Sequence, residues 1–196
     1  MALPTYGYVL GFDPAGKFIG LAAEGPRPAW PAGTRQRTVR ADAAAMAKLA
    51  STLQESPPPQ CTGIIWFRLP VPRDRYNWDA KTFEVVLRGE VPMARLTVEL
   101  EKPEPGLVEV VVVNSGQTTE PLPARVQLRW PESGRVLAAD GIGGFRLEIS
   151  GGAAQAMRRA ADAVADASIA PGRKVRIAWL RFAHETSVEV SLPLAR

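Results

Sequence analysis

The sequence predicts an α/β segment followed by an all-β domain. We expect a partial (βα)-barrel-like segment over residues 1–90 and an immunoglobulin-like antiparallel β-sandwich with an inserted helix over residues 91–196. The first observation is the apolar run Cys61–Pro70, which is dense and short enough for a strand buried on both faces. The second is a change near Gly89 from helical periodicity to twofold alternation. The third is the regular spacing of the later β runs between turn residues.

The chain begins with β-rich sequence. Residues 3–13 and 17–23 are extended in character, and Pro14-Ala15-Gly16 between them supplies a turn. This pattern predicts a hairpin, or equally a barrel strand extended by a short ribbon. Residues 26–40 are rich in Pro, Gly and Arg and are expected to form a loop that carries Trp30.

Two helices are expected in the first half. Asp42 is a candidate N-cap for a helix over 43–55, whose apolar stripe consists of Met46, Leu49, Ala50 and Leu53. Strand, helix and buried strand in succession predict a βαβ crossover. The second helix is expected over 78–88, with Gly89 as its C-cap.

The second half is expected to contain about seven strands and one helix. Twofold alternation predicts strands over residues 95–101, 108–113, 124–130, 135–139, 144–149, 174–181 and 186–192. The Ala-rich segment 151–168 is predicted to be a helix that lies outside the β core.

Composition excludes several classes of protein. The chain has 196 residues, a formal charge of +4, one cysteine and one histidine. Cys61 is expected to be an inert structural thiol, and His184 a loop residue, so we expect no metal and no cofactor. The arginines are scattered, no apolar run is long enough to cross a bilayer, and the first residues lack a signal-peptide pattern. We therefore expect no nucleic-acid partner and no membrane span, and localisation stays open.

Several segments, taken in order, resemble a bacterial family catalogued as domain of unknown function 3142. They are LPTYGY at 3–8, the FDxxGKxxGLxAE pattern at 12–24 and GIIWFRLP at 63–70, followed by Asp74 and Trp78. LVEVVVVNSG and PGRKVRIAWLRF look like the C-terminal region of the same family. The resemblance implies a barrel related in style to glycoside hydrolases, followed by a β-domain, and it brings no established reaction.

The α/β part is short for a barrel. A complete (βα) barrel needs about 250 residues and eight strands, whereas the first ninety residues suffice for about two βα units. We therefore expect a C-terminal remainder of a longer parent, or a gene product shortened at its start. Alternatively, a partner chain or the β-domain covers the incomplete sheet.

Two carboxylates are candidates for catalysis. Glu24 and Asp74 each follow a barrel-like strand, and glycoside hydrolysis uses two acids about 5 to 10 Å apart. The alternative interpretation is that Asp74 pairs with Arg73 or Arg75, while Glu24 is solvated. Asp79 is expected to support the start of its helix.

Aromatic residues near these acids are candidate stacking surfaces for a substrate. The substrate-binding candidates are Tyr6, Tyr8, Trp30, Arg68 and Trp78. The alternatives are that Trp30 plugs a core edge and that Arg68 makes a structural ion pair.

Two functions follow from these candidates. One is a carbohydrate-related remnant of a glycoside-hydrolase-like protein, as enzyme or saccharide binder. The other is a noncatalytic interaction protein whose sandwich binds another protein or a cell-surface polymer.

Overall fold

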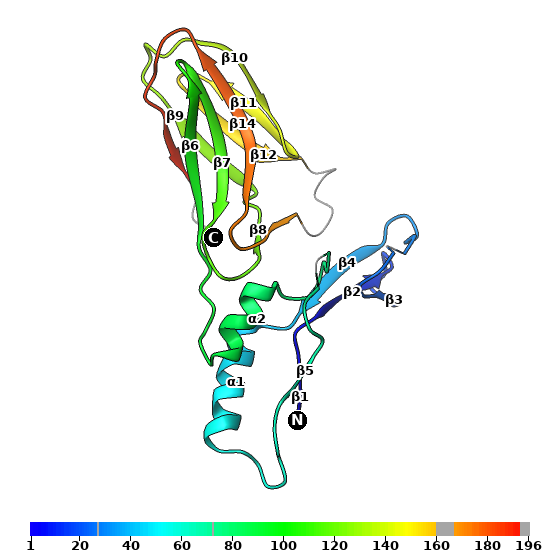
Figure 1. Ribbon diagram of the computed structural model, residues 1–196. Coiled ribbons are helices and arrows are strands. Elements are labelled where there is room, and N and C mark those ends of the chain that lie inside the picture. The colour runs from blue at the N-terminus through cyan, green and yellow to red at the C-terminus, as the bar shows by residue number, and fades with distance from the viewer. Residues whose placement is uncertain (27, 72, 160–166, 193–196) are drawn as a thin grey trace. The chain divides into compact units, whose positions relative to one another are not determined.

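The chain divides into two compact units in the computed structural model, which describes residues 1–26, 28–71, 73–159 and 167–192 (Figure 1). The first unit comprises residues 1–94 together with 117–119. The second comprises residues 95–116 and 120–196. In the described part of the chain no helix is long and apolar enough to cross a membrane.

The described residues of the first unit form two small sheets and two helices. A parallel pair joins β1 to β5, and an antiparallel sheet has the order β3-β2-β4. Its elements are β1 (Ala2–Pro4), β2 (Gly7–Phe12), β3 (Phe18–Ala22), β4 (Arg35–Arg40), α1 (Ala43–Glu55), β5 (Ile65–Phe67) and α2 (Ala80–Leu87).

The prediction of a (βα)-barrel-like segment is wrong. Among the described residues the only parallel pairing is β1 with β5, and no barrel closes around it. The strand expected to be buried on both faces is short and one-sided, because Trp66 packs on the helices while Ile65 and Phe67 are 69% and 59% exposed. The apolar run was dense, but only every second residue of it meets a core. A partner chain over the open face stays a prediction.

The two helices form close to where the sequence predicts them. Asp42 caps α1, since its Oδ1 accepts a hydrogen bond from the Ala45 N–H at 3.0 Å. Gly89 follows α2 with a φ of 74°, the left-handed conformation that favours glycine at a helix end. The buried face of α1 includes Ala47 in place of the predicted Leu49, which is 38% exposed.

The antiparallel sheet of the first unit corrects the predicted loop. The segment expected to be irregular ends in strand β4, which pairs with β2 along its whole length. The hairpin of β2 and β3 confirms the first of the two alternatives for the start of the chain.

The second unit is a sandwich of two four-stranded antiparallel sheets. The first has the order β10-β14-β7-β6 and the second β11-β12-β9-β15, with a two-stranded pair β8-β13 beside them. Its strands are β6 (Leu96–Glu104), β7 (Leu107–Asn114), β8 (Glu120–Pro121), β9 (Arg125–Arg129), β10 (Val136–Gly141), β11 (Phe145–Ser150), β12 (Ala153–Arg158), β13 (Ser168–Ile169), β14 (Lys174–Phe182) and β15 (Glu189–Ser191).

One hydrophobic core lies between the two sheets. Alternate residues of each strand point into it, as twofold periodicity requires. Val110, Leu128, Phe145, Ala156 and Leu180 are each at most 1% exposed. All seven predicted strands are present, although β15 is shorter than expected.

The predicted inserted helix is wrong where the structure describes it. Residues 153–158 form β12, in the middle of the second sheet between β11 and β9. Gly151 and Gly152 have φ of 47° and 76°, as in the tight turns that reverse a β-hairpin. The small side chains of Ala154 and Ala156 face the core, so packing overrides helix propensity. The rest of the predicted helix, 160–166, lies outside the described residues. The predicted fold class as a whole, an α/β part followed by an immunoglobulin-like sandwich with an inserted helix, is therefore replaced by a mostly β chain.

Candidate functional site

Asp74 is fully engaged by the loop that follows β5. Its side chain is 7% exposed and forms an ion pair with the Arg68 guanidinium. It also accepts hydrogen bonds from the Val71 N–H at 3.0 Å and from Asn77 Nδ2 at 2.9 Å. Arg68 therefore makes a structural ion pair, and Asp74 is its partner. Among the ion pairs of the described residues, Asp74 pairs with neither Arg73 nor Arg75.

Glu24 binds the same loop from the other side. The backbone N–H of Arg75 lies 2.8 and 2.9 Å from its two carboxylate oxygens. Oε1 also accepts from the N–H of Tyr76 at 2.6 Å and of Asn77 at 3.1 Å. Three successive backbone donors directed at one carboxylate form an anion-binding concavity, here filled by the protein's own side chain.

The two carboxylates therefore hold a loop in place. A general acid must carry a proton on an oxygen, yet every contact described for Glu24 is with a hydrogen-bond donor. A nucleophilic Asp74 would have to leave the Arg68 guanidinium and two N–H donors. The arrangement suits an architectural role for both residues.

Two buried polar residues that were not predicted from the sequence complete this network. Thr5 is fully buried, and its hydroxyl donates to the Arg68 carbonyl oxygen. Asn77 is 9% exposed; its Nδ2 also lies 3.3 Å from the same carbonyl, and its Oδ1 accepts from the Trp78 N–H at 2.9 Å. Neither residue type marks such a network in a sequence, because the partners are backbone groups far away along the chain.

The predicted stacking aromatics do not gather on one surface. Trp78 is 8% exposed, and its Nε1 donates to the Ala41 carbonyl oxygen at 2.8 Å. The Trp30 ring lies over Gly11 and Gly20, where an added Cβ would come within 2.5 and 3.1 Å of the ring. Tyr6 packs edge-on against Phe67, with ring centroids 5.6 Å apart.

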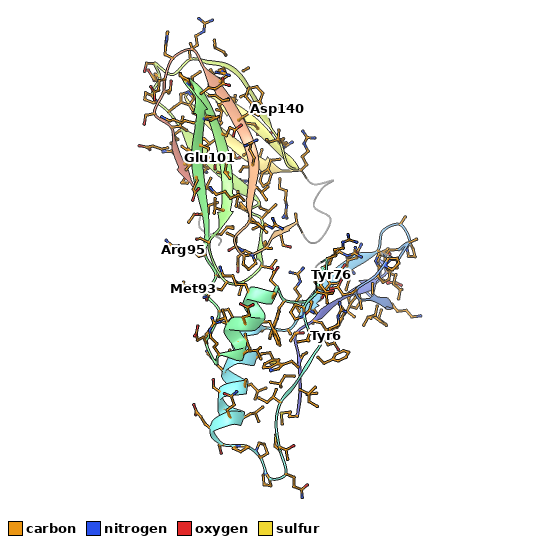
Figure 2. All side chains as sticks on the ribbon, in the orientation of Figure 1. Tyr6, Tyr76, Met93, Arg95, Glu101 and Asp140 are labelled. Carbon is orange, nitrogen blue, oxygen red and sulfur yellow. The ribbon has the colours of Figure 1, made fainter. Side chains whose placement is uncertain are left out.

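Tyr8 lies half-buried on the opposite face of β2 from Val9. Figure 2 labels Tyr6 and Tyr76, whose side chains lie near the start of β2. Only the Glu24, Arg68 and Asp74 group is brought together by the loop. Among the described residues no cluster of His, Cys, Asp and Glu could hold a metal ion.

A separate depression lies on the outer face of the sandwich sheet β11-β12-β9-β15. Its volume is about 400 Å³. We call it the glutamine depression; it is lined by Gln127, Leu128, Arg129, Glu148, Ile149, Ser150, Ala153, Ala154 and Gln155. These residues could not be predicted from the sequence as a site, since isolated glutamines in strands carry no motif.

Strand register explains the hollow. Glu148, Gln155 and Gln127 form one cross-strand row, and Ser150, Ala153 and Arg129 form the next. The side chains of Ser150 and Ala153 are small, so they leave space beside the longer ones.

Both parts of the chain match family profiles. Residues 1–72 match a family described as Domain of unknown function (DUF3142), and residues 97–183 match one described as Domain of unknown function (DUF8456). The first match confirms the resemblance noted in the sequence for the N-terminal segments. The later segments, which look like the same family in sequence, fall within the second match. No curated protein matches the chain.

Proposed function

We propose that this protein is a noncatalytic binding protein whose sandwich takes up a neutral saccharide in the glutamine depression. The observation that carries the proposal is the pair Gln127 and Gln155 at the centre of that depression. They are cross-strand neighbours, both half-buried, and in the described part of the chain neither side chain has a hydrogen-bond partner. Each carboxamide offers two donor hydrogens and an acceptor oxygen.

The charges around the glutamines favour a neutral ligand. Arg129 carries one positive charge, and Glu148 carries one negative charge that pairs with Arg146 at 3.2 Å. Arg129 has Glu189 as its cross-strand partner, so each charge that lines the hollow has an opposite charge beside it, and a polyanion or polycation gains little there. A polyhydroxylated ligand matches the mixture of donors and acceptors and can contact the small apolar side chain of Ala153, which lies on the same face of β12 as Gln155.

The first unit supports the noncatalytic part of the proposal. Glu24 and Asp74 are the two acids best placed for glycoside hydrolysis by sequence, and both are committed to the loop after β5. Turnover would require these contacts to break, whereas binding in the sandwich leaves them intact.

The affinity is expected to be weak. The depression is open, and none of the described residues that line it is aromatic. We expect a dissociation constant of about 1 mM, equivalent to roughly 4 kcal/mol of binding free energy. A polysaccharide that engages several copies of the protein would bind more tightly through avidity.

The test is a titration of the protein with neutral oligosaccharides, with the side-chain amide resonances of Gln127 and Gln155 followed by NMR. We expect both to shift with one ligand class, and Gln155→Ala to weaken binding about tenfold, the cost of a lost polar contact. Arg125→Ala, on the same outer face of β9 but outside the depression, is the matched control. A panel in which no oligosaccharide shifts these resonances contradicts the saccharide proposal. Hydrolysis of a glycoside that Glu24→Gln abolishes contradicts the noncatalytic one.

A further inference from the structure

The sheet β3-β2-β4 has one covered face. Val9 on this face is 3% exposed, and the Trp30 ring covers Gly11 and Gly20, which are cross-strand partners. Because side chains alternate along a strand, the residues between these positions point to the opposite face.

The opposite face is open and apolar. The cross-strand pairs Leu10–Leu21 and Phe12–Phe18 lie on it. Leu21 is 56% exposed and Phe18 53%. We call this the ribbon face; its residues are Tyr8, Leu10, Phe12, Phe18, Leu21, Arg35, Arg37 and Val39.

Two arginines border the apolar residues. Arg37 is the cross-strand partner of Leu10, and Arg35 is that of Phe12, so both guanidinium groups stand on the ribbon face. Arg35 donates to the Pro14 carbonyl oxygen at 3.2 Å, and in the described residues neither arginine has an acidic partner. Asp13, at the adjacent turn, accepts the Lys17 backbone N–H at 2.8 Å. The face is therefore an apolar strip beside an uncompensated positive strip.

We propose that the ribbon face binds an acidic, amphipathic peptide segment of another protein. Apolar side chains of the segment would cover Leu21 and Phe18, and its carboxylates would pair with Arg35 and Arg37, whose planar guanidinium groups match carboxylates. Complementary charge is the feature that selects this occupant, since a basic segment would face two unpaired cations.

Two other occupants fit the face less well. The Phe12 and Phe18 rings meet edge to face, 6.1 Å apart at 68°, so they pack on each other and do not present parallel platforms for nucleic-acid bases. A membrane-inserting hairpin carries its apolar residues at the tip, whereas the turn 13–17 contains Asp13 and Lys17. The apolar residues lie along the strands instead.

The test uses a labelled ten-residue peptide in which Leu and Glu alternate, and a second in which Lys replaces Glu. We expect the full chain to bind the glutamate peptide with an affinity that falls as salt is added. The double variant Arg35→Glu/Arg37→Glu should weaken this binding about tenfold, because two exposed ion pairs between peptide and protein become two like-charge repulsions. The same variant should bind the lysine peptide more tightly than the wild type does.

Arg125→Glu/Arg135→Glu makes the same change in net charge on exposed sandwich positions and should leave binding unchanged. Leu21→Ser, at an exposed position, should weaken binding without a change in charge. The proposal is overturned if neither peptide binds, if the two bind equally, or if both double variants have the same effect. Tighter binding of single-stranded DNA or of phosphatidylserine vesicles than of the glutamate peptide also overturns it.

Discussion

The carboxylate of Glu24 accepts the backbone N–H of Arg75 at both oxygens, at 2.8 and 2.9 Å, although the two residues are 51 positions apart in sequence. This contact ties the end of the β2–β3 hairpin to the loop after β5. It assigns an architectural role to one of the two acids that the sequence marks as catalytic candidates.

Replacing Glu24 by Gln should destabilise the first unit. The amide presents an NH₂ group to N–H donors and loses the charge that strengthens these hydrogen bonds. We expect a loss of about 2 kcal/mol in the free energy of unfolding. Both described helices lie in the first unit, so urea unfolding followed by helical circular dichroism measures it. Glu84→Gln, exposed on α2, is the control, and an equal effect of the two substitutions would refute the architectural role.

Gly11→Ala should destabilise the first unit because of Trp30. An added Cβ would lie 2.5 Å from the Trp30 ring, so the indole must move off the sheet. We expect a cost of about 1 to 3 kcal/mol, as for overpacked cores. Gly63→Ala is the matched control, since nothing lies within 4 Å of its Cβ position. Equal unfolding midpoints for the two variants would show that Trp30 does not cover Gly11.

Gly151→Ala distinguishes the observed hairpin from the predicted helix. In a helix this substitution stabilises, whereas at a φ of 47° it should cost about 1 kcal/mol because Cβ disfavours the left-handed region. Apart from its two chain neighbours, no described residue has an atom within 4 Å of that Cβ, so the backbone conformation decides the sign. Urea unfolding followed by the indole N–H resonance of Trp130 measures the effect. Gly151→Asn should be milder, and a gain in stability with Ala would contradict the turn.

A lysine on the outer face of the sheet that contains β6, β7 and β14 is expected to make the stability of the folded protein depend on pH in the alkaline range. Hydrogen bonds to Glu99 at 3.0 Å and to Glu101 at 3.2 Å raise the pKa of Lys174 above its ordinary value of 10.5. A raised pKa in the folded state stabilises fully below pH 10.5, and this contribution is lost as pH rises through the folded pKa. Glu101 lies on the edge strand β6, and Asp140 on the opposite edge strand β10 (Figure 2).

We therefore expect Lys174→Gln to be less stable than the wild type at neutral pH, with a difference that shrinks as pH rises beyond the ordinary lysine pKa. Added salt should shrink the difference too, because the groups are exposed. Lys48→Gln, in α1 and outside any ion pair of the described residues, makes the same change in charge. A difference between Lys174→Gln and the wild type that persists unchanged at high pH would contradict the assignment.

The sandwich strands could be predicted because each has one buried face, and the alternation of apolar and polar residues along the sequence indicates that face directly. β12 could not, because Ala154 and Ala156 are small enough for the space between the sheets but are also strong helix formers. Its signal was the Gly151-Gly152 pair, which marks a hairpin turn more strongly than it marks a helix start.

In the first half of the chain, the density of apolar residues led to the wrong prediction of a strand buried on both faces. Ile65 and Phe67 belong to an apolar run, yet they lie on the open face of a two-stranded sheet. The sequence identified Glu24, Arg68 and Asp74, and the structure brings them to one loop. Their roles could not be predicted, because the partners of Glu24 are backbone N–H groups whose direction depends on the fold of residues 75–77.

Amide hydrogen exchange at Arg75, Tyr76 and Asn77 reports most directly on the role of Glu24, because these three N–H groups are the ones that Glu24 binds. We expect slow exchange in the wild type and fast exchange in Glu24→Gln, with no glycoside turned over by either. Exchange that is fast in the wild type and unchanged by the substitution, together with a hydrolytic activity that the substitution removes, would contradict the architectural role of Glu24.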